Sequence, residues 1–73
     1  MTFNEHDVVV LTEDLPATGL RRGDVGTVVH VHERSAYEVE FTSATGDTIA
    51  LLPLVASQLR AAAATDVIAV RSA

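Results

Sequence analysis

Gly23-Asp24-Val25-Gly26-Thr27-Val28-Val29 is the segment that most strongly determines the fold of this chain. Gly23 can take the positive φ that a tight turn needs, and the Asp24 carboxylate can accept a hydrogen bond from a nearby backbone N–H. The β-branched residues that follow predict a strand over residues 25–32, in which Gly26 permits either a bulge or the close approach of another strand. A turn followed by a bent strand suits a barrel better than a flat sheet.

Another strand and a turn are predicted before this stretch. Residues 7–12 form a β-branched run that is typical of a strand. The polar excursion that follows has turn chemistry at residues 16–19. We expect Leu15 and Leu20, which bracket this turn, to pack back onto the core.

The regular alternation of apolar and charged residues over residues 37–41 predicts the third strand. Successive strand residues face opposite sides of a sheet, so Glu38 and Glu40 are expected to face water. The apolar residues of the segment are expected to face the core: Tyr37, Val39 and Phe41.

A fourth strand is predicted over residues 48–52. Because Pro53 has no N–H donor, we expect this strand to end there or to bulge at a sheet edge. Residues 55–60 then predict a short helical turn that delivers Leu59 to the core. The pattern as a whole predicts a mostly β barrel with a short helical turn near its end.

The length of 73 residues leaves room for one core, which we assign to a domain over residues 1–60. Residues 61–73 form a C-terminal extension, either an extra strand or disordered. Within it, residues 66–70 have strand character, and an exposed apolar edge there would pair with a second copy. A homodimer through these residues is therefore one expectation.

The charge balance points to protein partners rather than to nucleic acid. Ten acidic residues against five arginines and no lysine give a net charge of −5. Such a surface disfavours phosphate backbones and favours a basic partner. The chain has no cysteine, and we expect no cofactor. The N-terminal residues lack the pattern of a signal peptide or a membrane span, so we expect a cytoplasmic protein.

One pair of residues has the spacing of metal ligands. His30 and His32 are two apart on a predicted strand, so both imidazoles leave the same face and could share a divalent metal ion. His6 or Glu33 would supply a third ligand. The alternative is that both histidines are solvated on the outer face, because this spacing without a defined third ligand is a weak signal.

No catalytic residues stand out in the sequence. Glu38 and Glu40 share one face, but acid–base catalysis needs a cleft that shifts pKa values, and an exposed strand face does not provide one. Arg21 and Arg22, together with Arg34 and Arg60, could form a small basic spot for a carboxylate or a phosphate. The favoured alternative is that side chains of this loop pair with Glu13 and Asp14. The candidate partner-binding residues are charged side chains of this loop and of the third strand: Glu13, Asp14, Arg21, Arg22, Glu38 and Glu40.

The order of these signals resembles a small bacterial family of domains of unknown function, number 4926 (DUF4926). The residues that carry the resemblance are Val8-Val9-Val10-Leu11, Asp14-Leu15-Pro16, Gly19 to Val29, Tyr37-Glu38-Val39-Glu40-Phe41, Ile49-Ala50-Leu51-Leu52 and Leu59-Arg60. Residues 23–29 also resemble the turn of several SH3-like barrels, including KOW domains, a small barrel protein of the photosystem I reaction centre and the β subunit of nitrile hydratase. The resemblance implies an SH3-like barrel of about five strands and no assigned activity.

These observations together favour a non-enzymatic, acidic protein-binding module. The resemblance suggests an antitoxin-like or immunity-like role toward the product of a neighbouring gene. Two alternatives stay open: a metal- or small-ligand-binding domain that uses His30 and His32, and an RNA-associated, KOW-like module.

Overall fold

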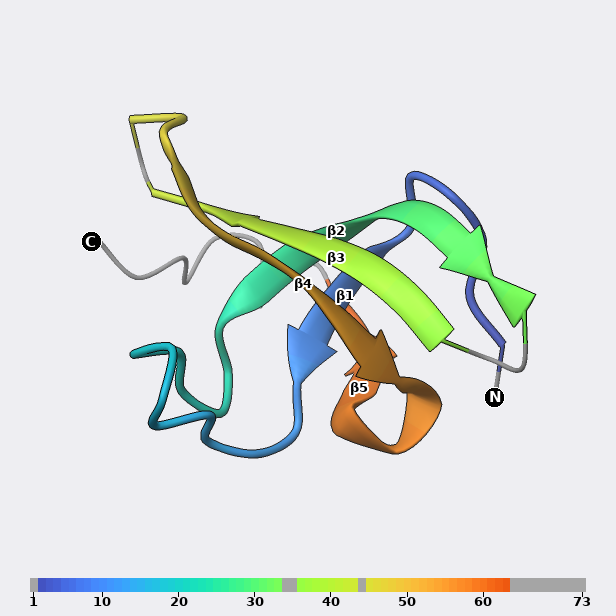
Figure 1. Cartoon of the computed structure of the whole chain (residues 1–73), viewed down its shortest axis with the longest axis horizontal. Helices are drawn as coiled ribbons and strands as arrows, with labels where there is room; N and C mark the ends of the chain where they lie inside the picture. The colour runs from blue at the N-terminus through green and yellow to red at the C-terminus, as the bar shows by residue number, and fades with distance from the viewer. Residues whose placement is uncertain (1, 34–35, 44, 64–73) are drawn as a thin grey trace.

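Five antiparallel strands form one sheet in the computed structural model, which describes residues 2–33, 36–43 and 45–63. The strand order is β4-β3-β2-β1-β5, and a short 3-10 turn, η2, joins β4 to β5 (Figure 1). The elements are β1 (Val8–Leu11), β2 (Val25–His32), β3 (Ala36–Thr42), β4 (Thr48–Val55), η2 (Ala56–Gln58) and β5 (Leu59–Ala61). The mostly β class and the helical turn near residues 55–60 are therefore confirmed.

The sheet curls because its two outermost strands are joined by a very short connection. β4 and β5 stand at opposite ends of the strand order, yet only the three residues of η2 separate them in sequence. A flat five-stranded sheet would need a connection that crosses its full width of four strand spacings, about 19 Å. The four residue steps from Val55 to Leu59 span at most about 14 Å. The sheet therefore bends until β4 and β5 approach each other.

The segment between β1 and β2 is an ordered excursion, as predicted. Leu15 and Leu20 pair in an isolated bridge, Leu20 is buried, and Leu15 packs against the core. Gly23 has a φ of 94°, and the Asp24 carboxylate accepts a hydrogen bond from the Arg21 N–H at 2.9 Å. Both roles assigned to the turn from the sequence are confirmed.

β2 begins and ends where the sequence predicts. Gly26 allows side chains of β3 to approach the β2 backbone closely, and it does not form a bulge. It lies opposite Phe41 in the pairing with β3. The irregularity in this pairing falls between Val28 and His30 instead. The bulge that bends β2 is therefore separate from the glycine.

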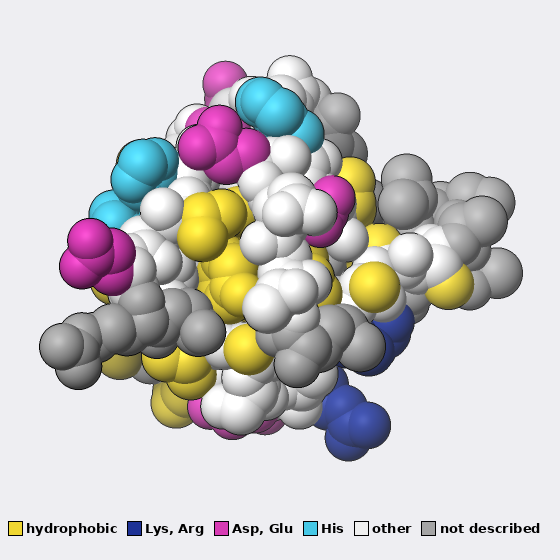
Figure 2. All heavy atoms as spheres, turned by 90° about the vertical axis from the view of Figure 1, so that its right-hand side faces the viewer, with side chains coloured by type: hydrophobic (Ala, Val, Ile, Leu, Met, Phe, Trp, Pro, Cys, Tyr) yellow, Lys and Arg dark blue, Asp and Glu magenta, His cyan; other side chains and the backbone are white. Residues whose placement is uncertain are grey.

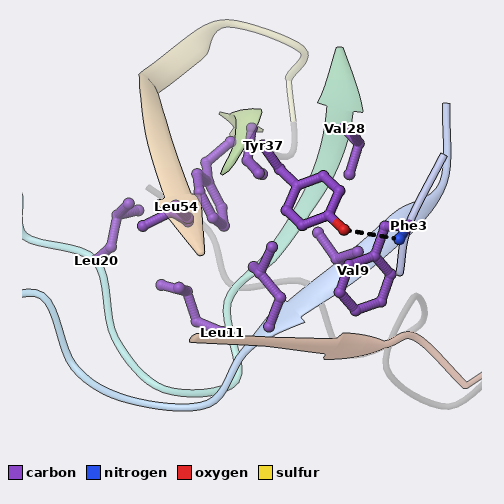
Figure 3. Close-up of a cluster of buried hydrophobic side chains, with 10 residues drawn as sticks. Phe3, Val9, Leu11, Leu20, Val28, Tyr37 and Leu54 are labelled. Atoms are coloured by element: carbon purple, nitrogen blue, oxygen red, sulfur yellow. Dashed lines mark hydrogen bonds between the residues drawn. The ribbon is translucent and has the colours of Figure 1, made fainter. Parts of the chain in front are cut away.

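The core lies on the concave side of the curled sheet. Phe3 reaches it from the N-terminal segment, and its N–H donates a 3.2 Å hydrogen bond to the Tyr37 hydroxyl (Figure 3). The two rings also meet edge to face, with centroids 5.4 Å apart. The cluster of buried side chains comprises Phe3, Val9, Leu11, Leu20, Val28, Tyr37, Val39, Phe41, Leu54 and Leu59.

β4 does not end at Pro53, so that part of the prediction is wrong. The strand continues to Val55, and Pro53 pairs with Glu38 of β3. Among the described strands β4 is an edge strand, where the nitrogen of a proline can face away from the ladder without loss of a hydrogen bond. The irregularity in the β3–β4 pairing lies between Phe41 and Thr42 rather than at Pro53.

The chain after β4 supplies a strand that the sequence pattern does not predict. β5 pairs with β1, and Leu59 reaches the core as expected. The predicted strand and dimer contact at residues 66–70, and most of the extension over residues 61–73, lie outside the described residues. The described residues contain no helix long and apolar enough to cross a membrane.

Candidate functional site

The outer face of β2, β3 and β4, which points away from the core, carries three parallel rows of side chains. Cross-strand partners project to the same face, so the pairing of the strands defines the rows. An apolar row on β4 consists of Leu51, Pro53 and Val55, an acidic row on β3 of Glu38 and Glu40, and a histidine row on β2 of His30 and His32.

The apolar row is exposed to solvent. Leu51 is 56% exposed and Val55 is 48% exposed, whereas the alternate residue Leu54 is buried in the core. Leu51 pairs directly with Glu40, and Pro53 pairs with Glu38. Directly opposed side chains have Cβ atoms about 5 Å apart, so apolar and acidic side chains form one continuous surface.

Local contacts hold both carboxylates of the acidic row. Glu38 Oε1 lies 2.8 Å from His32 Nε2, and Glu40 Oε2 accepts a 2.8 Å hydrogen bond from the Thr48 hydroxyl. Both glutamates are half-buried rather than fully solvated. A partner would therefore meet carboxylates that have already lost part of their conformational freedom.

The histidine row is present, but the third ligand predicted for a metal site is not beside it. The His30 and His32 rings meet edge to face with centroids 4.6 Å apart. His32 contacts Glu38, and His30 Nδ1 lies 3.8 Å from Glu5 Oε2. The contacts of the two rings therefore do not include His6 or Glu33, the two expected third ligands. The described part of the chain holds no group of three or more metal-ligating side chains that could bind an ion.

The loop between β1 and β2 holds the other four predicted binding residues, and its acids bind backbone and amide groups rather than arginine side chains. Asp14 Oδ1 accepts a 2.8 Å hydrogen bond from the Arg22 N–H, and Glu13 Oε2 accepts one from Gln58 Nε2 at 3.5 Å. The expected ion pairs of Arg21 and Arg22 are wrong, since neither guanidinium pairs with an acid within the described ranges. A main-chain donor satisfies the short Asp14 carboxylate, so it needs no arginine side chain.

The six predicted contact residues thus divide between two surfaces. Figure 2 looks onto the end of the sheet where β2 finishes and β3 starts. Acidic and histidine side chains gather at the top and left of this view, hydrophobic side chains lie in the middle, and basic side chains lie at the lower right. The charged loop and the acidic row are separate candidates for binding.

Sequence reasoning missed the apolar row. The predicted strand ended at Pro53, so the alternation of side chains through residues 48–55 was not recognised. In this alternation Ala50, Leu52 and Leu54 face the core. With an edge strand assumed, the same alternation assigns Leu51, Pro53 and Val55 to the outer face. The signal was present in the sequence, but it depended on the position of the strand in the sheet.

A single curled antiparallel sheet with a mixed apolar and acidic outer face defines a small, mostly β domain. The chain belongs to the family described as "Domain of unknown function (DUF4926)", whose model matches residues 5–61. The family resemblance seen in the sequence is therefore confirmed. Neither the curated proteins nor the solved structures contain a match to this chain.

Proposed function

We propose that this chain is a non-enzymatic protein-binding module that contacts its partner through the outer face of β2, β3 and β4. The observation that carries the proposal is the apolar row of β4 standing directly beside the acidic row of β3. Protein interfaces combine apolar contact area with polar groups around it, and contiguous exposed apolar side chains often mark interaction sites.

The charge of the chain supports a basic partner. The net charge is −5, and the only positively chargeable side chains on the described outer face of β2–β4 are the two histidines. Complementary charge speeds the encounter of two proteins and excludes partners of the wrong sign. The outer face is therefore better suited to binding a protein surface rich in arginine or lysine than to binding a phosphate backbone.

We further propose that the curled sheet is an SH3-like barrel from a bacterial, cytoplasmic protein. The strand order β4-β3-β2-β1-β5 and the short η2 connection between β4 and β5 support the barrel. The partner would be the product of a neighbouring gene, and the chain would act on it as an antitoxin-like or immunity-like protein.

Affinity capture with three baits tests the proposed function. The baits are the wild-type chain, the outer-face variant E38Q/E40Q and the loop variant R21A/R22A, each incubated with nuclease-treated host lysate and analysed by quantitative mass spectrometry. We expect a protein that the wild-type and loop-variant baits retain and the outer-face bait loses. Retention of no specific protein would contradict the proposal. Retention that occurs only in a parallel lysate without nuclease would also contradict it and would favour the RNA-associated alternative.

A further inference from the structure

We propose that the ligand of the outer face is a cationic amphipathic helix of the partner protein, with a basic stripe that lies over the acidic row and an apolar stripe that lies over the apolar row. This inference rests on the proposed binding function and specifies the chemistry of the partner. The inference follows from the register of β3 against β4, the spacing of the two glutamates and the lack of free N–H donors near the end of the β4 edge.

The two rows require two parallel stripes in the ligand. The acidic and apolar rows run along neighbouring strands, about 5 Å apart. An extended segment presents one row of side chains to the surface below it, because its alternate side chains point the other way. A helix presents two adjacent stripes along its length, which matches the arrangement of Glu38 and Glu40 beside Leu51 and Val55.

The spacing along the strands also fits a helix. Glu38 and Glu40 are two residues apart on a strand, which corresponds to about 7 Å. Residues i and i+4 of a helix are separated by about 6 Å along its axis. Arginine at these two positions can meet both carboxylates, and a planar guanidinium can bind a carboxylate through two parallel hydrogen bonds.

The edge of β4 is blocked against the addition of another strand. Pro53 has no N–H to offer, and the Val55 N–H donates a 3.0 Å hydrogen bond to Gln58 Oε1. A partner strand would therefore lack two donors along the last three residues of β4. Contact through side chains on the outer face remains available, because Leu51 and Val55 are about half-exposed and need no backbone pairing.

Binding of synthetic helical peptides tests the inference. The probe is a fluorescent peptide with arginine at positions i and i+4 beside a leucine stripe. One control peptide has the same composition in an order that destroys both stripes, and a second has glutamate in place of arginine. Fluorescence anisotropy gives the Kd of each. We expect the striped peptide to bind about tenfold tighter than the scrambled one and the glutamate peptide not to bind.

Matched variants of the protein locate the binding site. E40Q and L51S should each raise the Kd of the striped peptide about tenfold. D7N and V31S, which make comparable chemical changes away from the outer face, should alter it less than about twofold. Val31 pairs with Tyr37 and therefore lies on the core-facing side of β2. Thermal melting of each variant checks that it is folded. Equal affinity for the striped and scrambled peptides, or an equal effect of D7N and E40Q, would overturn the inference.

The capture experiment separates this inference from the proposed function. A partner that is captured and still binds the E40Q and L51S variants leaves the protein-binding function standing and refutes the helix inference. Failure to capture any protein refutes the binding function itself.

Discussion

Gly26 lies directly opposite Phe41 across the β2–β3 pair, and the Phe41 ring occupies the space that a side chain at position 26 would need. A Cβ at Gly26 would lie 2.8 Å from Phe41 Cε1 and 2.7 Å from Val39 Cγ1. Both neighbours are fully buried. Gly26 is therefore required because two large core residues of β3 pack against its bare backbone.

The substitution Gly26→Ala should destabilise the domain by about 1–3 kcal/mol, because the added methyl group overfills a packed core. Urea denaturation followed by circular dichroism measures the free energy of unfolding. The double variant G26A/F41L should lose less stability than the sum of the two single variants, since the smaller side chain makes room for the methyl group. Strict additivity would show that Phe41 is not the obstacle.

Removal of the Tyr37 hydroxyl should loosen the N-terminal segment. Tyr37→Phe keeps the ring that packs against Phe3 but leaves the buried Phe3 N–H without its acceptor. The expected loss of stability is about 1–3 kcal/mol, with faster hydrogen exchange at the Phe3 amide. An unchanged exchange rate at that amide would argue against the hydrogen bond.

The fold could be predicted from the sequence wherever a local pattern determined it. The alternation over residues 37–41 and the turn at Gly23 and Asp24 depend on neighbouring residues alone, and both predictions are confirmed. Pro53 misled the prediction because its effect depends on which strand lies beside it. β5 was missed because three residues carry too little pattern, and its pairing with β1 is set by tertiary contacts.

The candidate site could be predicted only in part for the same reason. The face shared by Glu38 and Glu40 follows from the period of a strand. The positions of Leu51 and Pro53 beside these glutamates depend on the register of β3 against β4. A local sequence pattern does not predict that register.

Two side chains of the β1–β2 loop can be compared directly. The Asp14 carboxylate accepts a hydrogen bond from the backbone, whereas the Arg22 guanidinium pairs with no acid in the described part of the chain. Asp14→Ala should lower the free energy of unfolding by about 1 kcal/mol, because the Arg22 N–H loses its acceptor. Arg22→Ala should change it by less than about 0.5 kcal/mol. Thermal or urea unfolding of the two variants provides the test. A larger loss for Arg22→Ala would mean that its side chain contributes contacts absent from this arrangement.

Zinc should leave the stability of the chain unchanged. His30 and His32 lie close enough to share an ion, but a stable zinc site takes at least three protein ligands, and Glu38 is already engaged by His32. A ligand that binds only the folded state raises the Tm, so melting curves with and without excess zinc are sufficient. A rise in Tm that H30A/H32A abolishes would favour the metal-binding alternative.

The decisive experiment on the outer face as the binding surface is to map the contact on the protein itself. Backbone amide chemical shifts of the labelled chain would be recorded before and after addition of the captured partner. If the outer face binds, the largest changes fall on residues 38–41 and 51–55. Changes confined to the loop over residues 13–24 would contradict the assignment.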